Sequence, residues 1–119
     1  MWTVYEYLYR DSGNFKAFGC VALKGRIDDA DREAIRLKLD SGEFFIAEQV
    51  GVPPLYEQLY RWSNGPTLSD HCWHEFIGVR ESDFRPAECT DGGDASEFVK
   101  HFNSVSEWDL SLSPHFELV

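Results

Sequence analysis

Residues 69–79, SDHCWHEFIGV, hold the densest group of chemically capable side chains in this sequence. Five of them lie within six positions: Asp70, His71, Cys72, His74 and Glu75. Imidazole, thiol and carboxylate groups can bind a transition metal, act as acids and bases, or attack an electrophile. Aromatic and β-branched neighbours make the same segment apolar and predict a strand. We therefore expect any functional site at the start of this strand.

Strand geometry divides this group into two sets, because successive side chains of a strand point to opposite faces. One face receives His71, Trp73 and Glu75, and the other receives Cys72, His74 and Phe76. Either face offers two metal ligands and would need the rest from elsewhere in the chain. No HExxH spacing is present. The sequence predicts no metal and no cofactor, and it leaves a metal site of His71, His74 and Glu75 as the alternative.

No motif indicates catalysis. The chain has no GxSxG, no P-loop and no GxGxxG. Cys72 has two histidine neighbours in sequence, but a catalytic cysteine and histidine usually meet across a fold. Among the 21 acidic residues, no pair is singled out for acid–base work. We predict no catalytic residues, and the sequence argues against an enzyme without excluding one.

Three polar residues outside this segment complete the predicted binding site. Arg10 and Asp11 follow the first predicted strand, and Glu48 lies on an otherwise apolar strand face. An acid on such a face must be paired or must lie at the edge of the buried region, and Arg10 or Arg80 would provide the partner. The predicted binding residues are thus Asp70, His71, Glu75, Glu48, Arg10 and Asp11.

The net charge of −10, from 21 acids and 11 bases, limits the partners. Binding to nucleic acid or to an anionic membrane surface requires a basic footprint, which this chain lacks. An acidic surface increases solubility and also attracts a basic protein partner. The longest apolar run is well short of a membrane span, and we expect no membrane association.

The three cysteines predict a reducing compartment. Cys20, Cys72 and Cys89 are odd in number, widely spaced and without a CxxC pair, so we expect no disulfide framework and a cytoplasmic location. Cys20 and Cys72 are expected to be small buried hydrophobic residues. The first residues, MWTVYEYLYRD, lack a basic region and a small-residue cleavage site, and they predict the first strand rather than a signal peptide.

Length and patterning indicate one globular domain over residues 1–119, since 43% of the residues are hydrophobic. Alternating apolar residues predict strands at 2–9, 15–24, 43–50 and 72–81. Helical spacing predicts helices at 29–39 and after Asp94, where Glu97 would complete a capping box. A short helix is expected at 55–62 and a loop at 84–93. Residues 108–112 form either an edge strand or a packed coil.

These elements predict an α+β fold with a mainly antiparallel sheet of four to five strands, covered by two or three helices. No internal repeat or linker divides the chain. The first two strands would form a hairpin through the turn residues at 11–14.

Three segments resemble those of a small, uncharacterised bacterial protein family. They read YLYRDSGNFKAFG at residues 7–19, FFIAEQVGVPPL at 44–55 and DHCWHEF at 70–76. The resemblance implies no activity and no ligand. It implies a set of polar positions to test first: Arg10, Asp11, Asn14, Glu48, Gln49, Asp70, His71, His74 and Glu75.

Two functional hypotheses follow. The favoured one is a small acidic protein-binding module, of the inhibitor or immunity type, that engages a basic protein partner. Immunity proteins of toxin systems and anti-defence inhibitors are of this general size and charge. The analogy rests on these general properties and not on a particular site. The alternative is a small enzyme or metal-binding protein that uses His71, His74 and Glu75.

Overall fold

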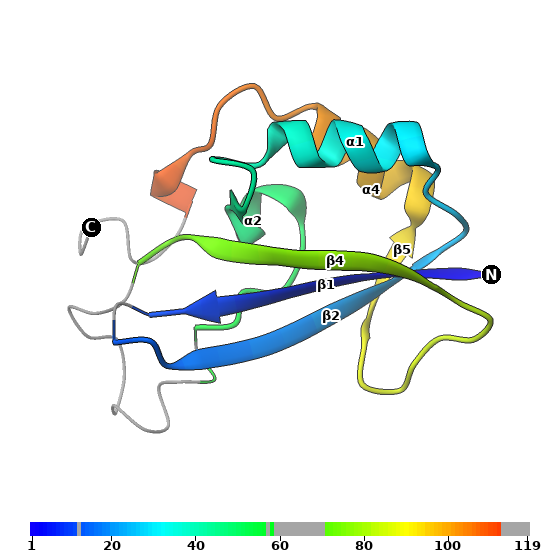
Figure 1. Cartoon of the computed structure of the whole chain (residues 1–119), viewed down its shortest axis with the longest axis horizontal. Helices are drawn as coiled ribbons and strands as arrows, with labels where there is room; N and C mark the ends of the chain where they lie inside the picture. Colours follow the sequence, from blue (N-terminus) through cyan, green and yellow to red (C-terminus); the bar gives the residue numbers. More distant parts are fainter. Residues whose placement is uncertain (12, 57, 59–70, 113–119) are drawn as a thin grey trace.

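The computed structural model describes residues 1–11, 13–56, 58 and 71–112 of the 119-residue chain. Its five strands form one sheet in the order β3-β4-β1-β2-β5, and the helices cover one face of this sheet (Figure 1). All neighbouring strands are antiparallel except β2 and β5. The predicted class, α+β with a mainly antiparallel sheet, is confirmed.

The first two strands form the predicted hairpin. β1 (Trp2–Arg10) and β2 (Lys16–Lys24) pair in register from Trp2↔Lys24 to Arg10↔Lys16. The turn is stabilised locally, because the Asp11 carboxylate accepts a hydrogen bond from the Phe15 N–H at 3.0 Å. Aspartate commonly makes this kind of contact in turns. The hairpin therefore fixes Arg10 and Asp11 at one end of the sheet.

β4 (His74–Ser82) pairs with the other side of β1, so β1 is the central strand. Glu6 lies opposite Gly78 and Tyr7 opposite Phe76, which leaves Ile77 as an extra residue in β4. Such a bulge bends its strand and increases the local twist. β3 (Phe44–Phe45) pairs with the start of β4.

Residues 43–50 differ from the prediction of a single strand. Only Phe44 and Phe45 are extended, and the chain then turns into the short helix α2 (Ala47–Val50). Gly51 ends this helix in the left-handed region, with φ = 78°, a conformation that glycine adopts without steric cost. The helix allows both Ala47 and Val50 to be buried, which their spacing of three residues favours.

The predicted loop at 84–93 is also wrong in part, because β5 (Thr90–Asp94) pairs in parallel with β2. Its sequence, TDGGD, has little strand propensity. A disulfide between Cys20 of β2 and Cys89, just before β5, holds the two segments with their Cα atoms 4.9 Å apart. The expectation of no disulfide is therefore wrong for this pair, and Cys20 is a partly exposed, bonded cysteine instead of a small buried hydrophobic residue.

Two longer helices cover the sheet. α1 (Asp29–Lys38) begins after Asp28, whose carboxylate accepts the Asp31 N–H, and acidic residues precede basic ones along it, as the helix dipole favours. α4 (Ala95–Asn103) begins at Asp94 as predicted, but the Asp94 side chain makes no capping hydrogen bond. The predicted capping box is thus absent.

The main core lies between the helices and the odd-numbered side chains of β1. The Tyr5 ring lies 5.1 Å from Phe98 and 5.7 Å from Phe45. The Tyr7 hydroxyl donates to the Pro53 carbonyl at 2.7 Å, and burial raises the pKa of both tyrosines. The opposite face holds a smaller cluster built on Val4, Ala22 and Cys89. The strand predicted at 2–9 is confirmed, and it buries side chains on both of its faces.

The edge strand that was one of two alternatives for residues 108–112 does not form. The chain there contains the 3-10 helix η1 (Leu110–Leu112). Trp108 packs against Phe102 and donates its indole N–H to the Lys38 carbonyl at 2.9 Å. The helix predicted at 55–62 lies mostly outside the described residues. Within the described residues, no helix has the length and apolar character needed to cross a bilayer.

Candidate functional site

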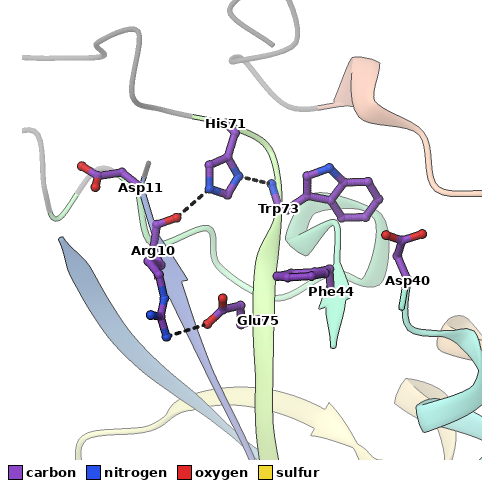
Figure 2. A pocket seen from close by; sticks show the side chains of 7 residues that line it. All are labelled: Arg10, Asp11, Asp40, Phe44, His71, Trp73 and Glu75. Atoms are coloured by element: carbon purple, nitrogen blue, oxygen red, sulfur yellow. Dashed lines mark hydrogen bonds and ion pairs between the residues drawn. The ribbon is translucent and has the colours of Figure 1, made fainter. Parts of the chain in front are cut away.

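A pocket of about 410 Å³ lies where the ends of β1 and β3 meet the start of β4 (Figure 2). Four predicted site residues line it together with three that were not predicted. The lining residues are Arg10, Asp11, Asp40, Phe44, His71, Trp73 and Glu75. Strand alternation explains part of this set, because His71, Trp73 and Glu75 project to the same side.

His71 holds the entrance of the pocket together through backbone contacts. Its Nδ1 accepts the Trp73 N–H at 3.0 Å, and its Nε2 contacts the Arg10 carbonyl oxygen at 2.6 Å. A nitrogen that faces a carbonyl must carry the proton, so the ring is the neutral Nε2–H tautomer. The His71 N–H also donates to the Tyr9 hydroxyl at 3.1 Å. His71 therefore joins the start of β4 to the end of β1 and has no ring nitrogen left for a ligand.

Arg10 and Glu75 form an ion pair along one side of the pocket. The Arg10 Nη2 lies 3.3 Å from the Glu75 Oε2, and its Nη1 donates to the Asn14 Oδ1 at 3.0 Å. Both side chains are partly exposed, so the pair contributes little to stability. It orients the Glu75 carboxylate toward Arg10 (Figure 2).

Asp40 and the rings of Phe44 and Trp73 form the other side (Figure 2). The Asp40 backbone N–H donates to the Phe44 carbonyl oxygen at 2.8 Å, and the Phe44 backbone N–H donates to the Asp40 carbonyl oxygen at 3.0 Å. Ser41 and Gly42 make this tight turn possible with positive φ angles of 53° and 74°. Among the described residues, no cation forms an ion pair with Asp40.

Sequence reasoning missed these three residues for different reasons. Trp73 lies on the same strand face as His71 and Glu75, so strand alternation alone places it with these two predicted site residues. The Ser41-Gly42 pair follows the helix predicted at 29–39, and these residue types also predict a turn that reverses the chain. Asp40 and Phe44 reach the pocket through that reversal, which no local pattern of apolar residues shows.

The remaining predicted residues lie elsewhere. Glu48 is on α2, where its Oε2 accepts a hydrogen bond from the Tyr56 hydroxyl group. Neither Arg10 nor Arg80 pairs with it, since Arg10 binds Glu75 and Arg80 lies 3.4 Å from Glu6. The predicted strand face that would have brought these groups together does not form. Asp70 lies outside the described residues.

His74 and Cys72 point away from the pocket into the core, as strand alternation predicted, and both are fully buried. The His74 Nε2 accepts the Leu55 N–H at 2.9 Å. Burial raises the pKa of the Cys72 thiol from 9.0 to about 11, so it is protonated at neutral pH and is a poor nucleophile. Within the part of the chain that the structure describes, no three His, Cys, Asp or Glu side chains are placed to hold a metal ion.

The pocket is chemically suited to a cation. Three carboxylates and one guanidinium line it, so their charges leave an excess of negative charge. The Trp73 and Phe44 rings add negative π faces, on which a guanidinium or ammonium group can stack. A flat arginine side chain would satisfy both features at once.

Comparisons with known proteins do not identify a ligand or a family for this chain. No protein-family model matches the sequence, and no significant match was found among curated proteins or solved structures. The resemblance to a small bacterial family therefore remains a prediction.

Proposed function

We propose that this protein is a small acidic binding module that engages a basic protein partner through the pocket at Asp40, Trp73 and Glu75. The observation that carries the proposal is that three acidic residues and two aromatic rings line one hollow, on a chain with a net charge of −10. Charge complementarity accelerates encounter and selects the partner. Aromatic residues in such pockets supply much of the binding energy.

An inhibitor or immunity-type role agrees with this chemistry. A nuclease or another nucleic-acid-binding protein has a cationic site that an acidic domain can cover. An arginine from that site would enter the pocket, stack on Trp73 and pair with Asp40. The metal or enzyme alternative has less support, because the rings of His71 and His74 already accept backbone N–H groups.

The test is affinity capture from the cells that make the protein, with two matched double variants. D40N/W73A removes one charge and one ring from the pocket. D83N/F84A removes the same chemistry from an exposed loop. We expect the wild type and D83N/F84A to recover the same basic protein, and roughly half-molar salt to release it because screening weakens exposed ion pairs.

D40N/W73A should bind that protein at least about tenfold more weakly, which corresponds to about 1.4 kcal/mol. Affinities are to be measured by calorimetry on the purified pair. The proposal fails if no basic protein is recovered, or if the two double variants bind it equally well.

We also propose a cytoplasmic location, which the Cys20–Cys89 bond makes testable. Disulfides are rare where cellular reductants keep thiols reduced. In a cytoplasmic protein, alkylation of intact cells before lysis should label Cys20 and Cys89, as read by mass spectrometry. Protection of both residues from alkylation under native and denaturing conditions would instead place the protein in an oxidising compartment.

A further inference from the structure

In the part of the chain that the structure describes, the second half of β4 has an unpaired edge. On the side away from β1, β3 reaches only the first residues of the strand, and the last contact is the Phe76 N–H to the Glu43 carbonyl at 2.8 Å. Among the described residues, no strand pairs with positions 77–82 on that side. Backbone N–H and C=O groups along such an edge can pair with a strand of another chain.

α1 runs beside β4 on the covered face of the sheet (Figure 1), and side chains of the two elements line a groove. A hollow of about 230 Å³ between them is lined by four charged residues of α1 and by Phe76, Gly78 and Val79 of β4. A second hollow, of about 500 Å³, continues toward Arg26, Arg80 and Glu81. Ile77 is half exposed beside it, and a Cβ atom placed on Gly78 would meet nothing within 4 Å. A strand added to the edge would therefore meet the side of α1.

The charges on that side of α1 are self-complementary. The four groove-lining residues are Asp29, Arg32, Glu33 and Arg36, which share one helix face by their spacing. In an antiparallel pair of such helices centred between positions 32 and 33, Asp29 of one copy faces Arg36 of the other. In the same arrangement Arg32 faces Glu33. Every acid thus meets an arginine of the other copy, in addition to the Arg36–Glu33 and Arg32–Glu81 ion pairs that form within one copy.

We propose that a second copy of this chain occupies the edge and that the protein forms a twofold-symmetric dimer. Antiparallel pairing of two β4 edges has a twofold axis perpendicular to the sheet, which also makes the two α1 helices antiparallel on the same face. With this axis level with the midpoint between positions 32 and 33 of α1, one symmetry operation pairs both the strand edges and the helix charges. The dimer joins two five-stranded sheets into one continuous sheet. The pocket at the start of β4 is separate, so this proposal does not depend on the proposed function.

Charge-reversal variants test the pairing. D29R places arginine opposite Arg36, and R36E places glutamate opposite Asp29, so each variant should be monomeric where the wild type is a dimer. The double variant D29R/R36E restores attraction and should dimerise. An equimolar mixture of the two single variants should form a heterodimer, because all four of the facing residues then pair acid with base.

Sedimentation velocity over a range of protein concentrations gives the oligomeric state, and circular dichroism melts confirm that each variant is folded. Amide hydrogen exchange adds a readout for the strand edge, since amides within 77–82 should exchange more slowly as the wild-type dimer fraction rises. The proposal is overturned by a wild type that stays monomeric at hundreds of micromolar. It is equally overturned by single variants that still dimerise, by a mixture that stays monomeric, or by unchanged exchange at 77–82.

Discussion

Reduction of the Cys20–Cys89 bond is expected to lower the free energy of unfolding by about 2–4 kcal/mol. The two residues are 69 positions apart, and a cross-link over a long loop removes much conformational freedom from the unfolded chain. The loss is a large part of the roughly 5–15 kcal/mol that stabilises a typical domain. The bond also joins β5 to β2, which is the one strand neighbour of β5 among the described residues.

Urea denaturation with and without a reductant measures this loss. C20A/C89A should match the reduced wild type and should not respond to reductant, whereas C72A should behave as the wild type does. Mass spectrometry must confirm that two thiols are released on reduction. Equal stability before and after a confirmed reduction would contradict the prediction.

Replacement of His74 is expected to have an effect of similar size. The side chain is fully buried, and the rings of Tyr9, Tyr56 and Phe45 surround it at centroid distances of 5.3, 5.8 and 5.9 Å. H74A should destabilise the fold by about 3–5 kcal/mol, because it leaves a cavity the size of the ring and a Leu55 N–H without its acceptor.

A second variant separates these two causes. H74F keeps most of the ring volume and removes only the acceptor of the 2.9 Å hydrogen bond from Leu55, so it should cost about 1–3 kcal/mol. The measurement is again urea denaturation, with the slope checked for two-state behaviour. If H74F were as damaging as H74A, the hydrogen bond rather than packing would dominate. A loss below about 1 kcal/mol for H74A would show that His74 is not a core residue.

Periodicity predicted the parts of the fold that bury one face of a regular element. The sequences of β1, β2, β4 and α1 each have a clear apolar periodicity. The inward position of His74 follows from strand alternation alone. β5 could not be predicted in this way. The segment TDGGD has no buried residue, so its strand conformation comes from pairing with β2, which is a tertiary effect.

The candidate site was predicted along β4 and at the end of β1, but not across the turn that follows α1. Arg10, Asp11, His71 and Glu75 meet as expected for residues at neighbouring strand ends. Asp40 contributes a carboxylate through the reversal at Ser41 and Gly42. Glu48 was misplaced because a strand pattern and a single helical turn are hard to distinguish over eight residues.

The central position of β1 has a consequence for how the chain is made. Its tyrosine face is synthesised before Phe98 and Phe102, whose rings pack on the Tyr5 ring with centroids 5.1 and 6.3 Å away. The β1–β2 hairpin alone cannot bury that face, since an isolated hairpin is only marginally stable. A nascent chain therefore carries an aromatic stripe that is not fully covered until α4 has been synthesised, and surfaces of this kind are the ones that chaperones protect.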